Sequence, residues 1–149
     1  MKPDPQRLEL SSYPHHFSFM PRFSDIDPQL HLNNVRIGEL YQEARISFFR
    51  ELGRLYSYTR PSDSRTLVAH QAMDYLDEVQ YPTSLTIGVG VARIGRSSYE
   101  LGLGMFQNDR CVGLSVAVLV HASAEGPAEI PAEFRAVLQQ TLLPARAPG

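Results

Sequence analysis

The clearest hydrophobic pattern in the chain lies between residues 33 and 53. Its apolar residues recur at intervals of three and four, so they share one face of an α-helix: Ile37, Leu40, Tyr41, Ala44, Phe48 and Leu52. Asn33 and Asn34 are both suited to cap the start of this helix, and Gly53 is suited to end it. We expect this helix, about five turns long, to form the centre of the core.

The second half of the chain changes to a period of two, which is typical of β-strands. The alternation covers residues 85–92, 99–106 and 112–120. The connections at 95–97 and 107–110 are short and rich in turn-forming residues, so these strands are expected to form an antiparallel meander. One face of the strands is bulky and is expected to bury the helix. The other face is built mainly of small residues, and we expect a second subunit to pack there.

Two less regular runs predict further strands. Residues 16–23 form the first, and Pro21 restricts it to a sheet edge or a bulge because proline cannot donate a ladder hydrogen bond. The second covers residues 67–75, and its expected packing residues are Val68, Met73 and Tyr75. Residues 55–64 carry only turn and loop signals, and a short helix is expected at 132–140.

The order of these elements predicts an α+β fold in which an antiparallel sheet wraps around one long helix. The chain has 149 residues, of which 43% are hydrophobic and 20% are charged, as in ordinary globular proteins. We therefore expect a single domain at 16–141, a flexible leader at 1–15 and a disordered tail at 142–149. The net charge of −2 gives no indication of a nucleic-acid partner.

Three features favour a soluble cytoplasmic protein. Residues 1–15 show no signal-peptide pattern. The longest apolar run is far shorter than the roughly 20 residues of a membrane-spanning helix. The single cysteine, Cys111, has no possible partner within the chain, which suits a reducing compartment.

The candidate chemistry is concentrated in residues 22–34, between a predicted strand and the start of the long helix. This block contains two carboxylates, one imidazole and three side-chain amides. The start of a helix also offers unpaired backbone N–H groups and the positive end of the helix dipole. A carboxylate beside such donors is suited to hydrolysis, either as a nucleophile or as a general base.

Simpler interpretations apply to several of these residues. Asp27 precedes a proline and is a typical turn or capping residue, and Asp25 is expected to stabilise the loop or the helix dipole. His15 and His16 have no further ligands at a usable spacing, so no metal site is expected. The glycines at 88 and 90 lack the third glycine and the helix of a dinucleotide-binding motif.

The same block resembles the start of a hotdog-fold acyl-CoA thioesterase of the 4-hydroxybenzoyl-CoA thioesterase type. In that family an aromatic strand end is followed by D-x-D and then by a helix that often opens with H-V-N-N. The matching residues are Arg22-Phe23, Asp25-Ile26-Asp27 and His31-Leu32-Asn33-Asn34. Comparable features downstream are Tyr41, Glu43-Ala44-Arg45, the hairpin at 93–98 and Ile130-Pro131. The resemblance covers residues 16–140.

The resemblance implies a hotdog fold, hydrolysis of an acyl-CoA or an acyl-carrier-protein thioester, and a homodimer or homotetramer with sites between subunits. It assigns the catalytic carboxylate to Asp27 and the amide that polarises the thioester carbonyl to Asn34. Related plant acyl-carrier-protein thioesterases have Asp, Asn and His at the spacing of Asp27, Gln29 and His31. Leu30 stands where many members have glycine, and it is expected to narrow the pocket.

The hairpin at 93–98 is the predicted grip for the phosphates of coenzyme A, with a solvated hairpin as the alternative. The residues concerned are Arg93, Arg96, Ser97 and Ser98. No cofactor is expected beyond the coenzyme A of the substrate. Two alternatives to a thioesterase stay open: a non-catalytic module that binds acyl-CoA or lipid, and an acyl dehydratase. An acyl dehydratase is expected to need an additional histidine near the helix, and this chain has none there.

Overall fold

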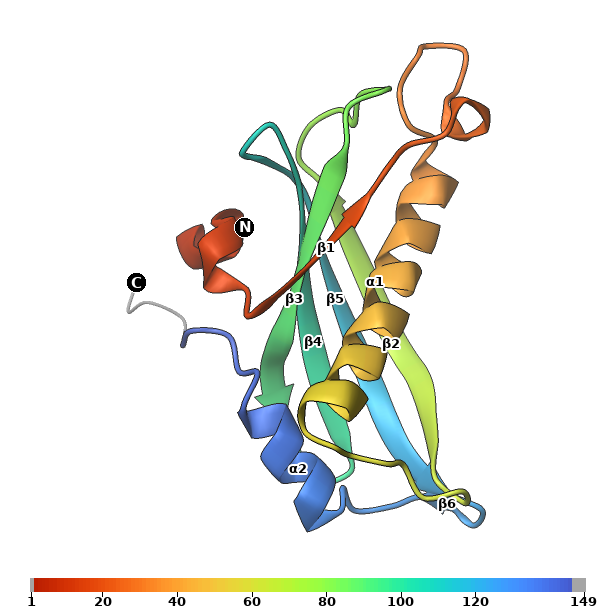
Figure 1. Cartoon of the computed structure of the whole chain (residues 1–149), viewed down its shortest axis with the longest axis vertical. Helices are drawn as coiled ribbons and strands as arrows, with labels where there is room; N and C mark the ends of the chain where they lie inside the picture. Colours follow the sequence, from red (N-terminus) through yellow and green to blue (C-terminus); the bar gives the residue numbers. More distant parts are fainter. Residues whose placement is uncertain (1, 146–149) are drawn as a thin grey trace.

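An antiparallel sheet wraps around one long helix in the computed structural model, which describes residues 2–145 (Figure 1). The helix α1 spans Asn34–Leu55. The strands are β1 (His15–Phe19), β2 (Arg65–Tyr75), β3 (Leu85–Ile94), β4 (Ser98–Gln107), β5 (Arg110–Ser123) and β6 (Gly126–Pro127). Their order across the sheet is β1-β3-β4-β5-β2, with β6 beside β5. The α+β architecture predicted from the sequence is confirmed.

Helix α1 begins where the capping residues place it. Asn33 is the N-cap, and its side-chain oxygen accepts a hydrogen bond of 2.7 Å from the Val35 N–H. The six apolar residues of the predicted stripe are all buried against the sheet. The helix continues two residues beyond Gly53 because the chain reverses at Ser57, which takes the left-handed conformation (φ 50°) usual after a helix end.

The predicted meander of β3, β4 and β5 is confirmed, with antiparallel pairing throughout. Asn108 and Asp109 form the tight turn between β4 and β5, and both have positive φ, as a two-residue hairpin turn requires. At the other end of the sheet, the Gly95 N–H closes the β3–β4 connection by donating to the Ser98 carbonyl.

The two edge strands differ in how well they are covered. β1 is an edge strand, which agrees with the prediction, but it ends at Phe19 and does not continue to Phe23 as predicted, because Pro21 cannot extend the ladder and residues 23–25 form a 3-10 helix. β2 forms the opposite edge, and its side chains are nearly all exposed. Val68 and Tyr75 were expected to pack inward, but they are 54% and 52% exposed because no element within residues 2–145 covers the β2 edge. Only Met73 of the expected packing residues is partly buried, beside Gly38 of α1.

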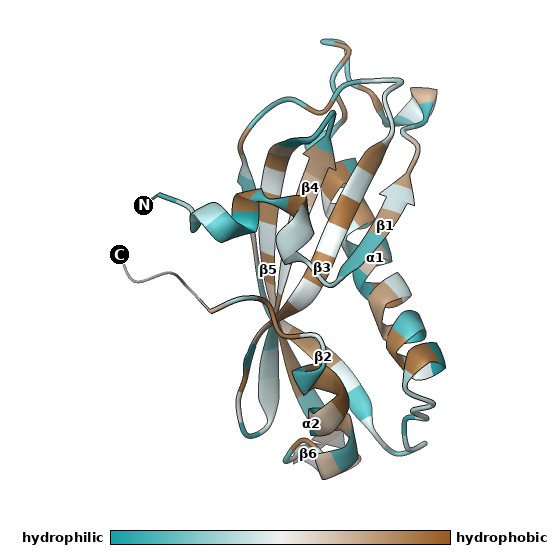
Figure 2. Ribbon diagram, turned by 60° about the vertical axis from the view of Figure 1, so that its left-hand side comes forward, coloured by the Kyte–Doolittle hydropathy of each residue, from teal (hydrophilic) through white to brown (hydrophobic). Residues whose placement is uncertain are grey.

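The outer face of β3 and β4 is covered by the two ends of the chain (Figure 2). The segment before β1 contains two short 3-10 helices, η1 (Pro5–Leu8) and η2 (Leu10–Ser12), and its Tyr13 ring lies on Gly88 and Gly104. Leu143 covers Gly90 and donates its N–H to the Val91 carbonyl. The expectation of a second subunit on these glycines is therefore wrong. The flexibility of the leader and tail stays a prediction, and residues 146–149 of the tail lie outside the described residues.

The short helix α2 (Ala132–Gln139) closes the end of the fold where α1 ends. It buries Phe134, Val137 and Leu138. Within residues 2–145, no helix is both long and apolar enough to cross a membrane.

The glycine at position 88 gives the first prediction. A Cβ there would lie 2.6 Å from Cγ of the buried Tyr13 ring, so Gly88→Val must displace the leader from the sheet. We expect the free energy of unfolding to fall by about 1–3 kcal/mol, measured by urea denaturation. Thr86→Val, on the same face of the same strand, is the control and should change stability little. Equal stability of the two variants would contradict the packing of Tyr13 on β3.

Candidate active site

The loop that leads into α1 is fixed by Asp25. This residue ends the 3-10 helix η3 (Phe23–Asp25) and is only 5% exposed. Its carboxylate accepts hydrogen bonds from the Arg22 backbone N–H and guanidinium, both at 2.9 Å, and lies 3.3 Å from Nε of Arg36. Its carbonyl accepts the N–H of Asn33. Asp25 thus ties η3 to the start of α1, in agreement with the structural role expected for it.

The same contacts explain the ionisation of Asp25. The hydrogen bonds from Arg22 hold the pKa of the Asp25 carboxyl below its usual range, with a further contribution from the charge of Arg36. Burial acts in the opposite direction and is outweighed. The Asp25 carboxylate is therefore paired with Arg22 and Arg36.

Asp27 lies in a small hairpin whose arms are joined by the bridge between Ile26 and Leu32. Its Oδ1 accepts the N–H groups of Gln29 at 2.9 Å and His31 at 3.2 Å. Its Oδ2 makes no hydrogen bond or ion pair within residues 2–145. Oδ1 therefore fixes the orientation of the carboxylate, and Oδ2 is not used by any neighbouring group among the described residues.

Leu30 completes this turn with a positive φ of 65°. That conformation favours glycine, which explains physically why a glycine suits this position. The Leu30 side chain is 70% exposed, so it does not narrow any pocket within this protomer.

The remaining predicted residues of the loop have different surroundings. His31 is half-buried, and its Nε2 lies 3.1 Å from Oε2 of Glu78. The Gln29 side chain is exposed. Asn34 is the first residue of α1, and its backbone N–H makes no hydrogen bond among the described residues. The Arg36 N–H likewise has no partner among the described residues, whereas the Val35 N–H is used by the Asn33 side chain, so the Asn34 and Arg36 N–H groups are the donors available at the helix start.

Two residues that hold the surroundings of the Asp27 hairpin were not found from the sequence. Gln107 was assigned to a turn, but its side chain is buried and bonds the backbone of Gln80 and Thr83, each at 2.9 Å. This contact fixes the loop after β2 beside the Asp27 hairpin, because Gln80 also forms a bridge with His31. Glu78, on the same loop, pairs with His31. Neither has a local sequence signal, because their partners are distant in the chain.

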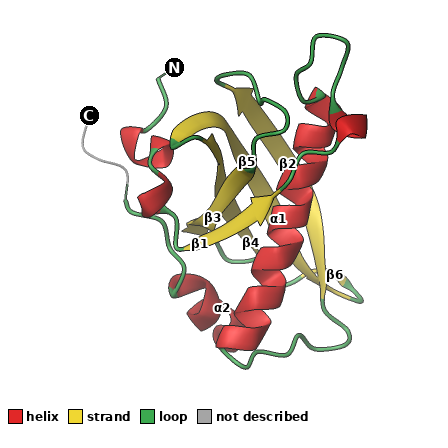
Figure 3. Ribbon diagram, turned by 45° about the horizontal axis from the view of Figure 1, so that its top comes forward, coloured by secondary structure: helices red, strands yellow, loops and turns green. Residues whose placement is uncertain are grey.

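The predicted coenzyme A residues lie at the opposite end of the molecule. Arg93, Arg96, Ser97 and Ser98 flank the β3–β4 connection, near α2 and the end of α1 (Figures 1 and 3). The hairpin backbone is held by hydrogen bonds from Ile130 and Arg135 to the Arg96 carbonyl, while the Arg93 and Arg96 side chains are exposed. β3 separates this hairpin from the Asp27 end by about 30 Å of strand. A single protomer does not bring the two groups together.

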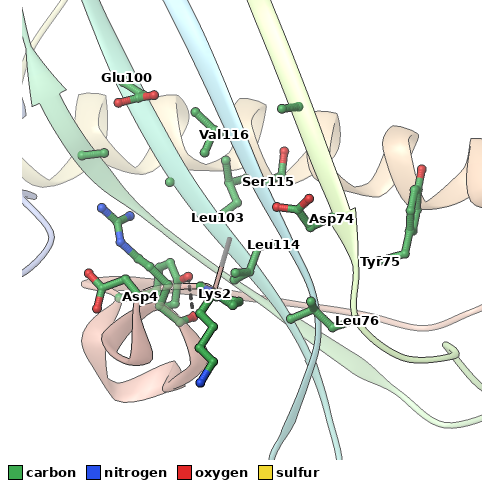
Figure 4. Close-up of a pocket in the computed structure, with 16 residues that line it drawn as sticks. Lys2, Asp4, Asp74, Tyr75, Leu76, Glu100, Leu103, Leu114, Ser115 and Val116 are labelled. Atoms are coloured by element: carbon green, nitrogen blue, oxygen red, sulfur yellow. Dashed lines mark hydrogen bonds between the residues drawn. The ribbon is translucent and has the colours of Figure 1, made fainter. Parts of the chain in front are cut away.

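Three clefts are prominent among the described residues, and Asp27 lines none of them. The largest, about 680 Å³, lies on the outer face between the leader, β2 and β5 (Figure 4). Its lining mixes Lys2, Asp4, Asp74 and Glu100 with apolar residues of the sheet. The second measures about 330 Å³ and is lined by residues of α1, β2, β5 and α2, among others. The third measures about 70 Å³ and lies at the β3–β4 connection. No group of three His, Cys, Asp or Glu residues that could hold a metal ion occurs within residues 2–145.

The contacts of Asp25 with Arg22 and Arg36 predict how the free energy of unfolding depends on pH. We expect Asp25→Asn to lower the free energy of unfolding by about 1–3 kcal/mol at pH 7, because two arginines lose their carboxylate. The folded-state pKa of Asp25 lies below its unfolded value of about 3.9, so its contribution is complete above that pH and is lost as the pH falls through the folded-state pKa. Urea denaturation should show the variant and wild type converging in acid. Asp63→Asn, at an exposed loop residue, should match wild type at both pH values.

Comparison with known proteins identifies the family to which the chain belongs. The family model of the Thioesterase-like superfamily matches residues 21–138. The PA5185 protein from Pseudomonas aeruginosa strain PAO1 is 27% identical, with a TM-score of 0.78 over 91% of this chain and 96% of that chain. A thioesterase from Thermus thermophilus, solved with coenzyme A and Zn, is 25% identical, with a TM-score of 0.73 over 87% of this chain and 95% of that chain.

A curated relative adds sequence similarity over a shorter region. The uncharacterized protein YsmA of Bacillus subtilis (strain 168) is 36% identical over 80 residues, which are 54% of this chain and 52% of YsmA. The match therefore spans about half the length of that relative. The structural likenesses confirm the hotdog fold, and the family match includes the Asp27 loop, α1 and the whole β3–β5 meander. This chain belongs to the thioesterase-like superfamily.

Proposed function

We propose that the protein is a thioester hydrolase that acts on an acyl-CoA and that Asp27 is its catalytic carboxylate. The observation that carries this proposal is the hydrogen bonding of the Asp27 carboxylate, which lies before the start of α1. Backbone N–H groups hold one of its oxygens, and the other has no partner among the described residues. The T. thermophilus thioesterase solved with coenzyme A supports an acyl-CoA as the substrate. An acyl-carrier-protein thioester is the alternative carrier.

The reaction adds water across the thioester C–S bond and releases a carboxylic acid and a thiol. Asp27 either attacks the carbonyl carbon, giving an anhydride that water then hydrolyses, or removes a proton from the attacking water. Negative charge develops on the carbonyl oxygen in both routes. The Asn34 N–H at the start of α1 is the proposed donor to that oxygen, and the helix dipole favours the same charge. His31, held by Glu78, is proposed to orient the water.

We also propose a homodimer formed through β2. An edge strand of eleven residues with exposed Leu67, Val68 and Tyr75 is a template for pairing with another strand. Two-fold antiparallel pairing of β2 with its copy places the Arg65 end of one strand beside the Tyr75 end of the other. The partner's Arg93–Ser98 hairpin then lies at the same end as Asp27. The dimer thus unites the two halves of the site that one protomer keeps apart.

Narrower features belong to the same proposal. The 4-hydroxybenzoyl-CoA type of thioesterase is proposed from the D-x-D and H-x-N-N block, and association of two dimers into a homotetramer is compatible with it. A cytoplasmic location is supported by the single free cysteine, Cys111.

The competing function is a module that binds acyl-CoA without hydrolysing it. The observation that favours this alternative is that Asp27 lines none of the three clefts described above.

Asp27→Asn tests the catalytic role directly. We expect wild-type protein to hydrolyse at least one acyl-CoA and the variant to lose on the order of a hundredfold or more in kcat, because the amide is neither a base nor a nucleophile. Free thiol release is the measurement, with circular dichroism to confirm folding. Asp109→Asn, in the exposed β4–β5 turn, is the matched control and should retain activity. Unchanged turnover in Asp27→Asn excludes Asp27 as the catalytic group, and binding without turnover in wild type favours the binding module.

The β2 edge gives a separate prediction. Val68→Glu combined with His70→Glu places like charges on both copies of the paired strand, which disfavours cross-strand pairing. We expect a monomer in analytical ultracentrifugation and a parallel loss of hydrolysis. Gln140→Glu combined with Leu142→Glu adds the same charge at exposed residues away from β2 and should leave the dimer intact. A doubly substituted β2 variant that stays dimeric rejects this interface.

A further inference from the structure

The hairpin that carries Asp27 is joined to the loop of residues 76–84, which connects β2 and β3. The Leu32 N–H at the end of the hairpin donates a hydrogen bond of 2.9 Å to the Val79 carbonyl of this loop. The side chains of both residues are buried in the same hydrophobic cluster. The position of the Asp27 hairpin therefore depends on how the 76–84 loop is held.

The first attachment of the 76–84 loop is a β-bulge in β5. The register of β4 and β5 shifts between Met105 and Phe106, which leaves Val112 of β5 as an extra residue without a partner on β4. The Val112 carbonyl instead accepts the N–H groups of Leu76 and Asp77, at 3.0 and 3.1 Å. Bulges release backbone groups from the ladder in this way, and they are common beside active sites. The bulge fixes the start of the loop.

The second attachment is the side chain of Gln107, the last residue of β4. Its Oε1 accepts the Gln80 N–H, and its Nε2 donates to the carbonyls of Gln80 and Thr83, each at 2.9 Å. A primary amide has two N–H groups and one carbonyl oxygen, so every polar group of this side chain is used on the same loop. Gln107 is only 3% exposed. Its amide fixes the rest of the loop.

The backbone of Gln80 connects this amide to the candidate catalytic residues. Gln80 forms an antiparallel bridge with His31, and Glu78 of the same loop lies 3.1 Å from His31 Nε2. The His31 N–H in turn donates to Oδ1 of Asp27 at 3.2 Å. Among the described residues, Gln107 makes no hydrogen bond to the hairpin itself. Its influence on His31 and Asp27 passes through the loop.

We propose that Gln107 is a positioning residue of the candidate active site and that hydrolysis depends on its amide holding the 76–84 loop against the Asp27 hairpin. The inference rests on the proposed function for its catalytic consequence. Reaction rates are sensitive to small misplacements of the reacting groups, even when the cause lies away from them. Loss of the amide is therefore expected to lower kcat rather than raise KM. A purely structural amide would change stability and leave the kcat of the folded protein unchanged.

Two substitutions remove this attachment in different ways. Gln107→Glu keeps the size of the side chain and an acceptor for the Gln80 N–H, but it turns an oxygen toward two carbonyl oxygens. Gln107→Leu has a similar volume and removes all three hydrogen bonds. Thr141→Val is the matched control, because it removes a buried hydrogen bond of 2.9 Å to the Leu138 carbonyl just after α2, away from the Asp27 hairpin.

Steady-state hydrolysis of hexanoyl-CoA and benzoyl-CoA, followed by thiol release, separates positioning from stability. We expect both Gln107 variants to lose on the order of tenfold or more in kcat with little change in KM. Thr141→Val should retain the wild-type kcat. Circular dichroism confirms that each variant is folded at the assay temperature. A folded Gln107 variant with the wild-type kcat would overturn the inference.

Amide hydrogen exchange tests the same inference without turnover. Mass spectrometry of peptides that cover residues 26–33 should show faster exchange in both Gln107 variants than in wild type, because the loop no longer holds the hairpin. Thr141→Val should leave exchange at 26–33 unchanged. Unchanged exchange in the Gln107 variants overturns the inference even if wild type is an active hydrolase. Faster exchange in a protein whose wild type hydrolyses no acyl-CoA supports the attachment through Gln107 and rejects the proposed function.

Discussion

Burial of one face of α1 against the curled sheet is the constraint on which the rest of the structure depends. The stripe from Ile37 to Leu52 is almost completely excluded from water, so the helix has one allowed rotation and one position on the sheet. That position fixes both ends of the helix. Its start follows the Asp27 hairpin, and its last turns line the cleft of about 330 Å³ beside α2. The length of α1, 22 residues, thus sets the separation between these two features.

Each end is then refined by contacts between distant segments. At the start of α1, Asp25 joins η3 to the helix through Arg22 and Arg36, and Gln107 fixes the loop that carries Glu78 and Gln80. At the other end, Phe49 of α1, Tyr99 of β4 and Phe134 of α2 pack edge-on, and Tyr58 of the loop after α1 stacks on Phe134. These are different kinds of interaction for different tasks. Directional hydrogen bonds orient a carboxylate, whereas aromatic packing maintains a small apolar volume.

The same fold explains which surface is available to a second copy. Glycines on β3 and β4 allow Tyr13 and Leu143 to lie directly on the sheet, so the chain covers this outer region with its own ends. Among the described residues the β2 edge has no such cover, and it keeps exposed apolar side chains and unpaired backbone groups. Pairing there is the proposed route by which Asp27 and the Arg93–Ser98 hairpin of the partner subunit come together. The proposed dimer therefore joins the sheets of the two protomers and also completes the proposed active site.

The sequence by itself determined the elements that depend on local periodicity and capping. The helix stripe, the Asn33 cap and the β3–β5 meander follow from side-chain spacing, because each residue contacts neighbours at fixed offsets. The dense polar block around Asp27 was also visible for that reason. Only the tertiary structure decided that Val68 and Tyr75 are exposed, that Gln107 is buried, and that the Arg93–Ser98 hairpin lies far from Asp27. These properties depend on which strands form the edges and which distant segments meet, and no local pattern encodes them.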